Sequence, residues 1–495
     1  MSFEQVRHEA FEGYPHTHLF TTSEPAGSVV FRTDAMQQVL CSPRGGQLVK
    51  DVLSGKATSD VLPLAIREFA CAENSGLPES AGGSARTGLH DVQTLCLVPT
   101  MDCQLRCGYC RITQEQGRQK GLRLSPQDAC DAIDRVLGVV PPGTKRTLVF
   151  FGGEPLLGPE TVFAAIAHVR RGTEADNTSI MLQTNGVAID ASTAAFLAAN
   201  DVLVYLSLDG VAEVHDRQRK LAGGGSSYER SVAGYRNAKE HGCCMAISAT
   251  ATKQTADRFA SSFDEMIGEL LPDKCGVVTH LHPLATGRSP HQCSAADSAR
   301  LQIATYLAAR EKGIYHQQMC EKVGPFVSGN WRRYACAGCG GKAVIAPDGK
   351  AGICEYNAGD GRSFVPLQEF SPDTVSDFLS WAARSPLDTG ECMHCPALPI
   401  CGGGCAYDSQ VVMGDPLTFD PWLCEANIKI IHWLMQDLLS HLQDRLNGAD
   451  FHEVTPEERA LTLGNIPLNR ALAPMPSIAE FREVPKAGTC TPVTE

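Results

Sequence analysis

Six strand-like segments alternate with helical segments between residues 91 and 315, and this alternation is the strongest constraint on the fold. Each strand segment is a short apolar run, and the segments between them carry apolar residues at helical spacing. The predicted strands are 92–98, 147–151, 179–184, 202–208, 245–252 and 276–282. Repeated βα units of this kind predict an α/β fold, with a parallel sheet curled into a full or partial barrel and helices outside. In such barrels the chemistry gathers at the carboxyl ends of the strands.

Residues 1–90 are predicted to form a small α+β unit that precedes the barrel. Its expected elements are two short strands and a helix, at 18–22, 29–33 and 47–53. The stretch 73–88 is rich in glycine and serine, so we expect it to link this unit to the barrel at 91–315.

Residues 316–445 are predicted to be a cysteine-rich C-terminal domain that closes with an amphipathic helix at 426–445. Of the 21 cysteines, three lie between 103 and 110 and eight between 336 and 424. Clusters of this kind in an intracellular-looking chain indicate metal binding or catalysis rather than disulfides. Because 316–425 has weak periodicity, we expect metal rather than a large apolar core to hold it together. Residues 446–495 contain several prolines and are predicted to be an extended tail.

The composition excludes some classes of protein. The 43 Lys+Arg and 56 Asp+Glu give a net charge of −13, which argues against binding nucleic acid through broad phosphate contacts. No apolar run approaches the roughly 20 residues of a membrane helix. The first residues lack a basic start followed by an apolar core, so no secretory signal is predicted. We therefore expect a cytoplasmic protein without a nucleic-acid or membrane partner.

Three cysteines follow the first predicted strand. Cys103, Cys107 and Cys110 form a C-x3-C-x2-C triplet on a loop. Three thiolates so close together can face one inorganic centre, and three ligands on a four-iron cubane leave one iron open to a non-protein ligand. The spacing alone leaves two other interpretations open: a zinc site with a fourth ligand from elsewhere, or three unrelated buried thiols.

In its context the triplet resembles the signature of the radical S-adenosylmethionine (SAM) superfamily, C-x3-C-x-(aromatic)-C after the first strand of a partial barrel. The aromatic is Tyr109, which in that family lies against the SAM adenine. The resemblance implies a partial, TIM-like (β/α)6 barrel and a [4Fe–4S] cluster on Cys103, Cys107 and Cys110. SAM would chelate the open iron, and its reductive cleavage would give a 5′-deoxyadenosyl radical that abstracts a substrate hydrogen.

Further segments at the predicted strand ends match the same family. The segment 151–155, Phe-Gly-Gly-Glu-Pro, resembles its GGE motif, in which glycine lets a backbone carbonyl approach the methionine ammonium and the glutamate orients the loop. A single Asn-Gly or Asp-Gly is typical of a plain turn. Here, however, four segments follow four successive predicted strands in order: the cysteine triplet, the GGE segment, 183–186 and 207–210. Besides Tyr109, the residues that the resemblance assigns to SAM binding are Gly152, Gly153, Glu154, Asn185, Ser207, Asp209 and Arg219.

The later cysteines form a longer pattern, C-x2-C-x9-G-x4-C followed by C-x2-C-x5-C-x3-C and a final cysteine. Paired C-x2-C motifs are also typical of zinc ribbons, and eight thiols could equally hold two zinc ions. The full run resembles the SPASM domain, the C-terminal extension of radical SAM enzymes that modify peptides and proteins. The resemblance implies two auxiliary [4Fe–4S] clusters, three in all. The first would be held by Cys336, Cys339, Cys354 and Cys405, and the second by Cys392, Cys395, Cys401 and Cys424.

Glu355 directly follows Cys354. In the sulfatase-maturating branch of the resembled family an aspartate at that position acts as a base. Glu355 is therefore a candidate catalytic base, and a solvated carboxylate is the alternative.

A SPASM extension together with a small unit before the barrel is similar to maturases of ribosomally made peptides. We therefore expect hydrogen abstraction from a peptide or protein, followed by cross-linking or oxidation. The implied partners are a leader-containing substrate, bound by strand addition to the N-terminal unit, and an external electron donor such as flavodoxin or ferredoxin. The alternatives are a formylglycine-forming sulfatase-maturating enzyme, an enzyme that uses SAM on a small metabolite, and a zinc-binding interaction protein on a decayed barrel.

Overall fold

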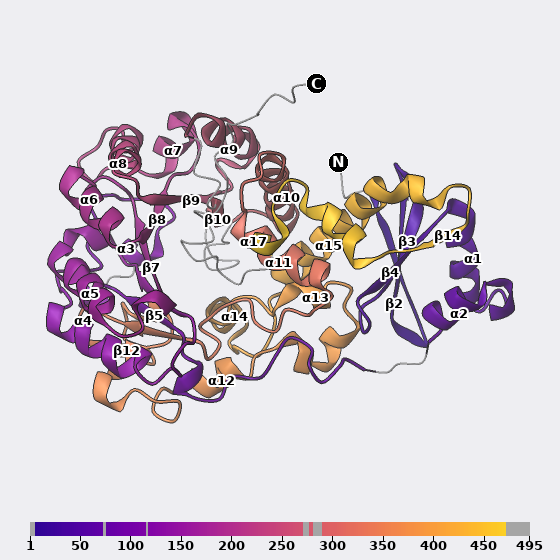
Figure 1. The fold of residues 1–495 in the computed structure, drawn as a ribbon, viewed down its shortest axis with the longest axis horizontal. Helices are drawn as coiled ribbons and strands as arrows, with labels where there is room; N and C mark the ends of the chain where they lie inside the picture. The colour runs from indigo at the N-terminus through magenta and orange to yellow at the C-terminus, as the bar shows by residue number, and fades with distance from the viewer. Residues whose placement is uncertain (1–4, 73–75, 115–116, 271–276, 281–289, 472–495) are drawn as a thin grey trace, which may run out of the picture.

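A computed structural model of the chain describes residues 5–72, 76–114, 117–270, 277–280 and 290–471. Figure 1 shows two sheets side by side: a curled parallel sheet with helices on its outer face, and a smaller antiparallel sheet formed largely by the N-terminal residues. The segment rich in cysteine lies below and between them.

The parallel sheet confirms the predicted partial barrel. Within the described residues its strands pair in the order β10-β9-β8-β7-β6-β5, so each strand lies beside its neighbour in the chain. They are β5 Thr94–Leu97, β6 Arg146–Phe150, β7 Thr178–Thr184, β8 Val202–Ser207, β9 Cys244–Thr250 and β10 Val277–His280. Predicted and observed strands agree within a few residues at each end, and residues 276 and 281–282 of the sixth prediction lie outside the described residues.

Helices cover the outside of this sheet, as the apolar spacing predicts. On α5 the buried face carries Val162, Ala165, Ile166 and Val169, which recur at helical spacing. Local capping sets the helix starts: the Ser125 hydroxyl accepts from the Asp128 N–H before Pro126 begins α4. The helices are α4 Pro126–Ala132, α5 Pro159–Arg171, α6 Ala191–Ala199, α7 Ala212–Gln218, α8 Tyr228–Glu240, α9 Ala256–Leu270 and α10 Ala295–Glu311.

The cysteine-rich region extends the same sheet. Strand β11, Lys342–Ile345, pairs in parallel with β5, and β12 (Lys350–Gly352) and β13 (Val365–Pro366) continue the sheet in antiparallel fashion. Its apolar residues, including Phe378 and Trp381, are buried in one core with those of the barrel. The expectation that this region has hardly any apolar core was therefore wrong, because its short elements bury their side chains against the barrel. Its helices are α11 Gln317–Ser328, α12 Phe378–Ala382, α13 Leu398–Cys401, α14 Ala406–Met413 and α15 Pro421–Leu442.

The N-terminal sheet has the order β1-β2-β3-β4-β14 in the described residues, and all its pairings are antiparallel. Its last strand, β14 (Phe451–Glu453), comes from the predicted tail and pairs with β4. The extended tail predicted for 446–495 is thus wrong up to residue 471, where α16 (Pro456–Arg459) and α17 (Leu468–Ala471) also form; residues 472–495 lie outside the described residues. Elements this short leave no periodic signal in a sequence. The other strands are β1 Arg7–Phe11, β2 Tyr14–Ser23, β3 Ala26–Arg32 and β4 Gln37–Cys41.

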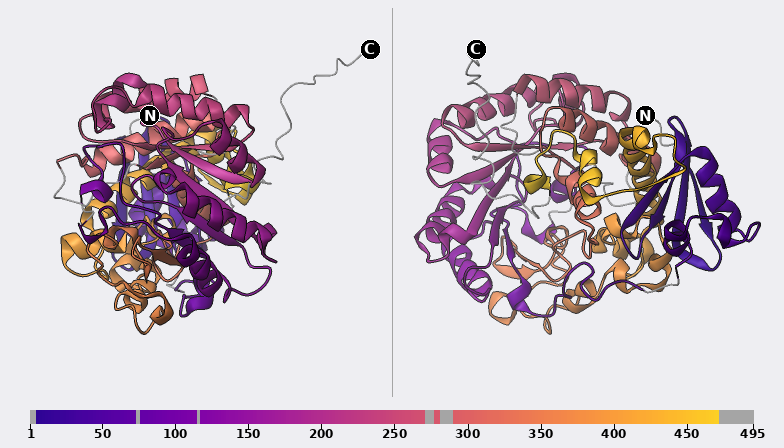
Figure 2. Two further views of the ribbon diagram at one scale, coloured as in Figure 1. Left: turned by 90° about the vertical axis from the view of Figure 1, so that its left-hand side faces the viewer. Right: turned by 45° about the vertical axis from the view of Figure 1, so that its right-hand side comes forward.

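This small sheet is packed on both faces. Helices α1 (Pro43–Leu53) and α2 (Leu64–Ala70) cover one face. On the other, Phe20 and Phe31 share a core with residues of α10, α11 and α15, which Figure 2 shows alongside the sheet. The Trp331 indole N–H donates to the Thr33 carbonyl at 2.8 Å across this junction. No helix among the described residues is long and apolar enough to cross a membrane.

We predict that Phe31→Ala lowers the free energy of unfolding by about 3–5 kcal/mol, since the ring is fully buried and packs edge-on against Phe326 of α11 at 6.1 Å between centroids. Chemical denaturation measures the loss. The matched control is Val61→Ala, at a side chain that is 46% exposed in the same unit, with an expected change below about 0.5 kcal/mol. Equal losses in the two variants would contradict the shared core.

Candidate active site

A cavity of about 1050 Å³ runs along the inside of the barrel sheet, from strand starts such as Thr94 and Thr147 to the loops at the strand ends, and borders the cysteine-rich region. It is lined by nine of the residues predicted for the barrel site: Cys103, Cys107, Tyr109, Cys110, Gly152, Gly153, Asn185, Ser207 and Arg219. Four predicted residues of the C-terminal region line it as well: Cys336, Cys354, Glu355 and Cys405. The structure therefore brings both cysteine patterns to one space.

The triplet lies on the loop that leaves β5, and all three of its cysteines line the cavity. Burial raises the pKa of Cys103 to about 11 and that of Cys107 to about 12, and Cys110 adds to both shifts. The Asn185 amide also reaches the Cys103 sulfur at 3.7 Å. Thiols held this way stay protonated in the absence of a cation, whereas a bound metal converts them to thiolates. An all-thiol, half-buried donor set of three fits an iron–sulfur cluster with one open position.

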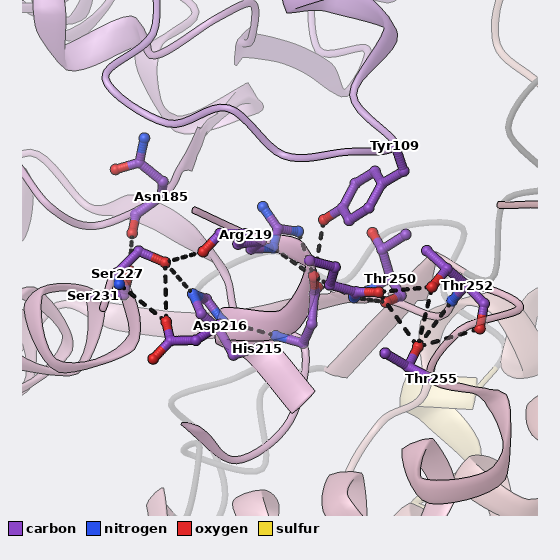
Figure 3. Close-up of polar contacts among 12 residues, drawn as sticks. Tyr109, Asn185, His215, Asp216, Arg219, Ser227, Ser231, Thr250, Thr252 and Thr255 are labelled. Atoms are coloured by element: carbon purple, nitrogen blue, oxygen red, sulfur yellow. Dashed lines mark hydrogen bonds and ion pairs between the residues drawn. The ribbon is translucent and has the colours of Figure 1, made fainter. Parts of the chain in front are cut away.

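A buried carboxylate, Asp209, organises the next part of the site (Figure 3). It accepts from Arg219 Nε at 2.7 Å and Nη2 at 3.0 Å, from the Tyr109 hydroxyl at 2.9 Å and from the Thr250 N–H at 2.8 Å. Burial alone would raise the pKa of Asp209, but Arg219 and these hydrogen bonds lower it below the usual value. Asp209 is not among the lining residues that the structure describes, so it positions Arg219 and Tyr109 rather than facing the cavity.

His215 and Asp216 precede Arg219 in a segment that resembles the family, but sequence reasoning gave them no role and missed Ser227, which contacts both residues and Arg219. Burial lowers the pKa of His215 to about 4, so its ring is neutral; Nδ1 accepts from the Asp209 N–H at 3.3 Å and Nε2 lies 2.9 Å from the Ser227 hydroxyl. Ser227 donates to the Arg219 carbonyl at 2.5 Å, and Asp216 accepts from the Ser227 N–H at 3.0 Å. Figure 3 shows this chain of contacts. In the sequence, the only sign of this hydrogen-bond network is the spacing of His215 and Asp216 before Arg219.

Glu154 joins two strand ends instead of facing the cavity. It is fully buried and accepts from the Thr184 hydroxyl and the Asn185 N–H at 2.8 Å each, and from the Leu156 N–H at 3.1 Å. Burial raises the pKa of Glu154, and these three hydrogen bonds oppose the shift. The carboxylate thereby fixes Asn185, whose amide contacts Cys103.

The two glycines of the GGE segment let two loops pass very close together. A Cβ on Gly153 would lie 2.2 Å from the Asp102 carbonyl oxygen, and one on Gly152, where φ is +139°, would lie 2.5 Å from that of Thr100. Only glycine fits there. The structure thus gives these residues a role that the sequence did not predict, the support of the loop that carries the triplet.

Electrostatic interactions connect the eight later thiols in two sets, and their assignment to two clusters stays a prediction from the sequence. In the first group, Cys336 raises the pKa of Cys339 to about 12 together with burial, and Cys336 and Cys354 both act on Cys405. In the second, burial and the neighbouring thiols raise the pKa values of Cys392 and Cys395 to about 12 and that of Cys424 to about 11, with Cys401 acting on all three.

Glu355 lies at the cavity beside Lys342, with which it forms an ion pair. Burial would lower the pKa of Lys342, but Glu355 and the nearby thiols raise it well above the usual value. The carboxylate is therefore held next to a permanent cation.

A partial barrel with a thiol triplet after its first strand, a buried Arg–Tyr–Asp arrangement beside it and two further thiol groups defines a protein that binds a metal cluster and a polar cofactor. Comparison with known proteins assigns the barrel segment. Residues 97–264 match the Radical SAM superfamily. This segment therefore resembles a radical SAM domain, and that superfamily implies a [4Fe–4S] cluster and SAM.

The relatives include several maturases. The radical SAM cyclopropyl synthase TigE of Paramaledivibacter caminithermalis is 20% identical, covering 70% of this chain and 74% of its own. The mycofactocin maturase MftC of Mycobacterium ulcerans is 28% identical over 62% of this chain and 80% of its own. A serine-type anaerobic sulfatase-maturating enzyme of Klebsiella aerogenes is 23% identical over 61% and 76%.

The fold has a solved counterpart. The structure of anSMEcpe with bound AdoMet and the Cp18Cys peptide superposes with a TM-score of 0.57 at 20% identity, covering 72% of this chain and 99% of that one.

We predict that Gly153→Ala weakens SAM binding to the reconstituted protein by about tenfold or more, because the added methyl group displaces the loop that carries the triplet. Equilibrium binding measures the change. Gly268→Ala on α9, where an added Cβ meets nothing within 4 Å, is the control. Wild-type affinity in the first variant would contradict the role of the close contact.

Proposed function

We propose that this protein is a maturase that uses SAM to abstract hydrogen from a ribosomally made peptide or protein, leading to cross-linking or oxidation. The observation that carries the proposal is the single cavity of about 1050 Å³ shared by the triplet and the first C-terminal thiol group. This volume is at the upper limit of ordinary ligand pockets, which suits a cofactor and a peptide side chain together. Relatives named as peptide and sulfatase maturases support the same class.

The residues of the barrel have separate tasks in this proposal. Cys103, Cys107 and Cys110 would hold the cluster, which with SAM supplies the radical that abstracts hydrogen. Tyr109 offers an aromatic face at the cavity, fixed through its hydroxyl to Asp209. Arg219 presents a cation suited to a carboxylate, and its own pairing with Asp209 keeps it in place. Buried apolar neighbours of the site exclude water.

The two C-terminal thiol groups are placed so that clusters bound to them could carry an electron away from the substrate. Cys336, Cys354 and Cys405 line the cavity, whereas Cys392, Cys395, Cys401 and Cys424 are not among its described lining residues. Two auxiliary [4Fe–4S] clusters on these groups, both ligated fully by thiolates, would accept the electron left after hydrogen abstraction. An external donor such as flavodoxin or ferredoxin would deliver the electron that starts the reaction.

We predict that Cys107→Ala abolishes SAM cleavage, because a triplet ligand is lost. Cys401→Ala should retain uncoupled SAM cleavage but form less than about a hundredth of the modified peptide, because the electron has no acceptor. Chromatography of 5′-deoxyadenosine and mass spectrometry of the peptide measure the two quantities. Cys130→Ala, outside the three groups, is the control. Parallel loss of both activities in Cys401→Ala would contradict the electron relay.

The N-terminal sheet would recognise the leader of the substrate. Strand β14 covers one edge of this sheet, so β1 is the outer strand at the other edge. An extended peptide can add to such an edge through main-chain hydrogen bonds. Strand β1 is five residues long and partly exposed. A leader segment of similar length could therefore pair with β1 as an additional strand of the sheet.

We predict that deletion of residues 1–11, which removes β1, raises the KM for a leader-containing peptide about tenfold or more while leaving uncoupled SAM cleavage nearly unchanged. Deletion of residues 1–4 alone is the matched control. If the longer deletion leaves peptide turnover intact, the leader does not bind this edge.

A sulfatase-maturating activity is the second candidate, and Glu355 at the cavity favours it. Its ion pair with Lys342 keeps an ionised carboxylate beside the first auxiliary group, where a base is needed. We predict that Glu355→Gln lowers formylglycine formation on a sulfatase peptide about 100-fold while SAM cleavage continues. Asp360→Asn, at an exposed carboxylate in the same region, is the control. Unchanged product formation would remove Glu355 from the role of base.

A further inference from the structure

Arg384 is a buried cation between the two C-terminal thiol groups. Arg384 is only 2% exposed, and its side chain is one of the largest among the fully buried ones. The guanidinium interacts electrostatically with Cys339 and Cys405 of the first group and with Cys392 and Cys401 of the second. Arg384 is not among the described lining residues of the cavity, so it does not face the substrate.

The hydrogen bonds of Arg384 leave its charge unmatched by protein carboxylates. Nη2 donates to the Gly403 carbonyl at 2.5 Å and to the Ser409 hydroxyl at 2.9 Å, and Nη1 donates to the carbonyls of Pro416 and Thr418. The Phe419 ring lies 4.5 Å from the guanidinium carbon. In the described part of the chain no carboxylate pairs with Arg384, and its buried Nε has no hydrogen-bond partner.

A full charge in such surroundings is costly unless an anion nearby balances it. The surrounding anions are the thiolates that would bind the auxiliary clusters. Gly403 lies in the segment between Cys401 of one group and Cys405 of the other, so the bond from Arg384 fixes the chain that joins both ligand sets. Arg384 is thus linked to both thiol groups, by its hydrogen bond to the segment between them and by its charge.

We propose that Arg384 is a positioning residue that sets the reduction potentials of both auxiliary clusters through its fixed positive charge. This inference rests on the proposed function, in which two such clusters relay the electron. Reduction adds negative charge to a cluster, and a nearby cation stabilises that form. The potential of an iron–sulfur cluster depends on local charge and hydrogen bonds. Arg384 therefore makes both clusters better electron acceptors.

The test is a redox titration of the anaerobically reconstituted full chain, followed by electron paramagnetic resonance. Arg384→Gln should shift both auxiliary midpoint potentials to more negative values and leave that of the SAM-responsive cluster unchanged. Arg384→Lys, which keeps the charge, should restore most of the shift. Full-iron Arg384→Gln with one or both auxiliary potentials unchanged would overturn the proposal.

A second variant decides the matter if Arg384→Gln does not retain its iron. Ser409→Asp keeps the arginine but places a carboxylate beside it, so it should lower both auxiliary potentials in the same direction. Unchanged potentials in this variant would equally overturn the role of Arg384. A wild-type chain with only about four irons would instead contradict the two auxiliary clusters themselves, and with them this inference.

Discussion

The parallel pairing of β5 with β11 is the interaction on which the rest of the site depends. Strand β5 leads directly into the Cys103–Cys110 loop, and β11 lies between Cys339 and Cys354 of the first C-terminal group. Because the two strands share a sheet, loops from distant parts of the chain open into the same cavity. Neither cysteine pattern could reach the other if the C-terminal region were a separately folded module.

Buried charge is the second constraint. Some buried acidic groups are ionised and balanced by neighbouring donors, and others stay protonated. Asp209 is surrounded by donors, so its charge is balanced within the protein and Arg219 is held rigidly. Thiols such as Cys107 and Cys392 are different, since burial and neighbouring thiols raise their pKa values, so they stay neutral until a cation arrives. A site built this way is preorganised for its cofactor, and metal binding completes it electrostatically.

The barrel could be predicted from the sequence because long periodic segments and strand-end motifs are local signals. The thiol grouping rests on a resemblance in spacing and stays a prediction. Other features depend on contacts far apart in sequence: β14 pairing with β4, the burial of Phe378 and Trp381 against the barrel, and the placement of Asp209 behind Arg219. No local pattern encodes them. The role of the glycines at 152 and 153 in SAM binding stays a prediction, and their close approach to the Asp102 and Thr100 carbonyls is a tertiary contact that the sequence does not signal.

The most direct test of the account is the metal content of protein prepared and reconstituted without oxygen, followed by addition of SAM and dithionite. Three four-iron clusters predict about twelve irons per chain, broad absorbance near 400 nm and release of 5′-deoxyadenosine. A colourless protein that carries about two zinc ions and releases no 5′-deoxyadenosine would contradict it.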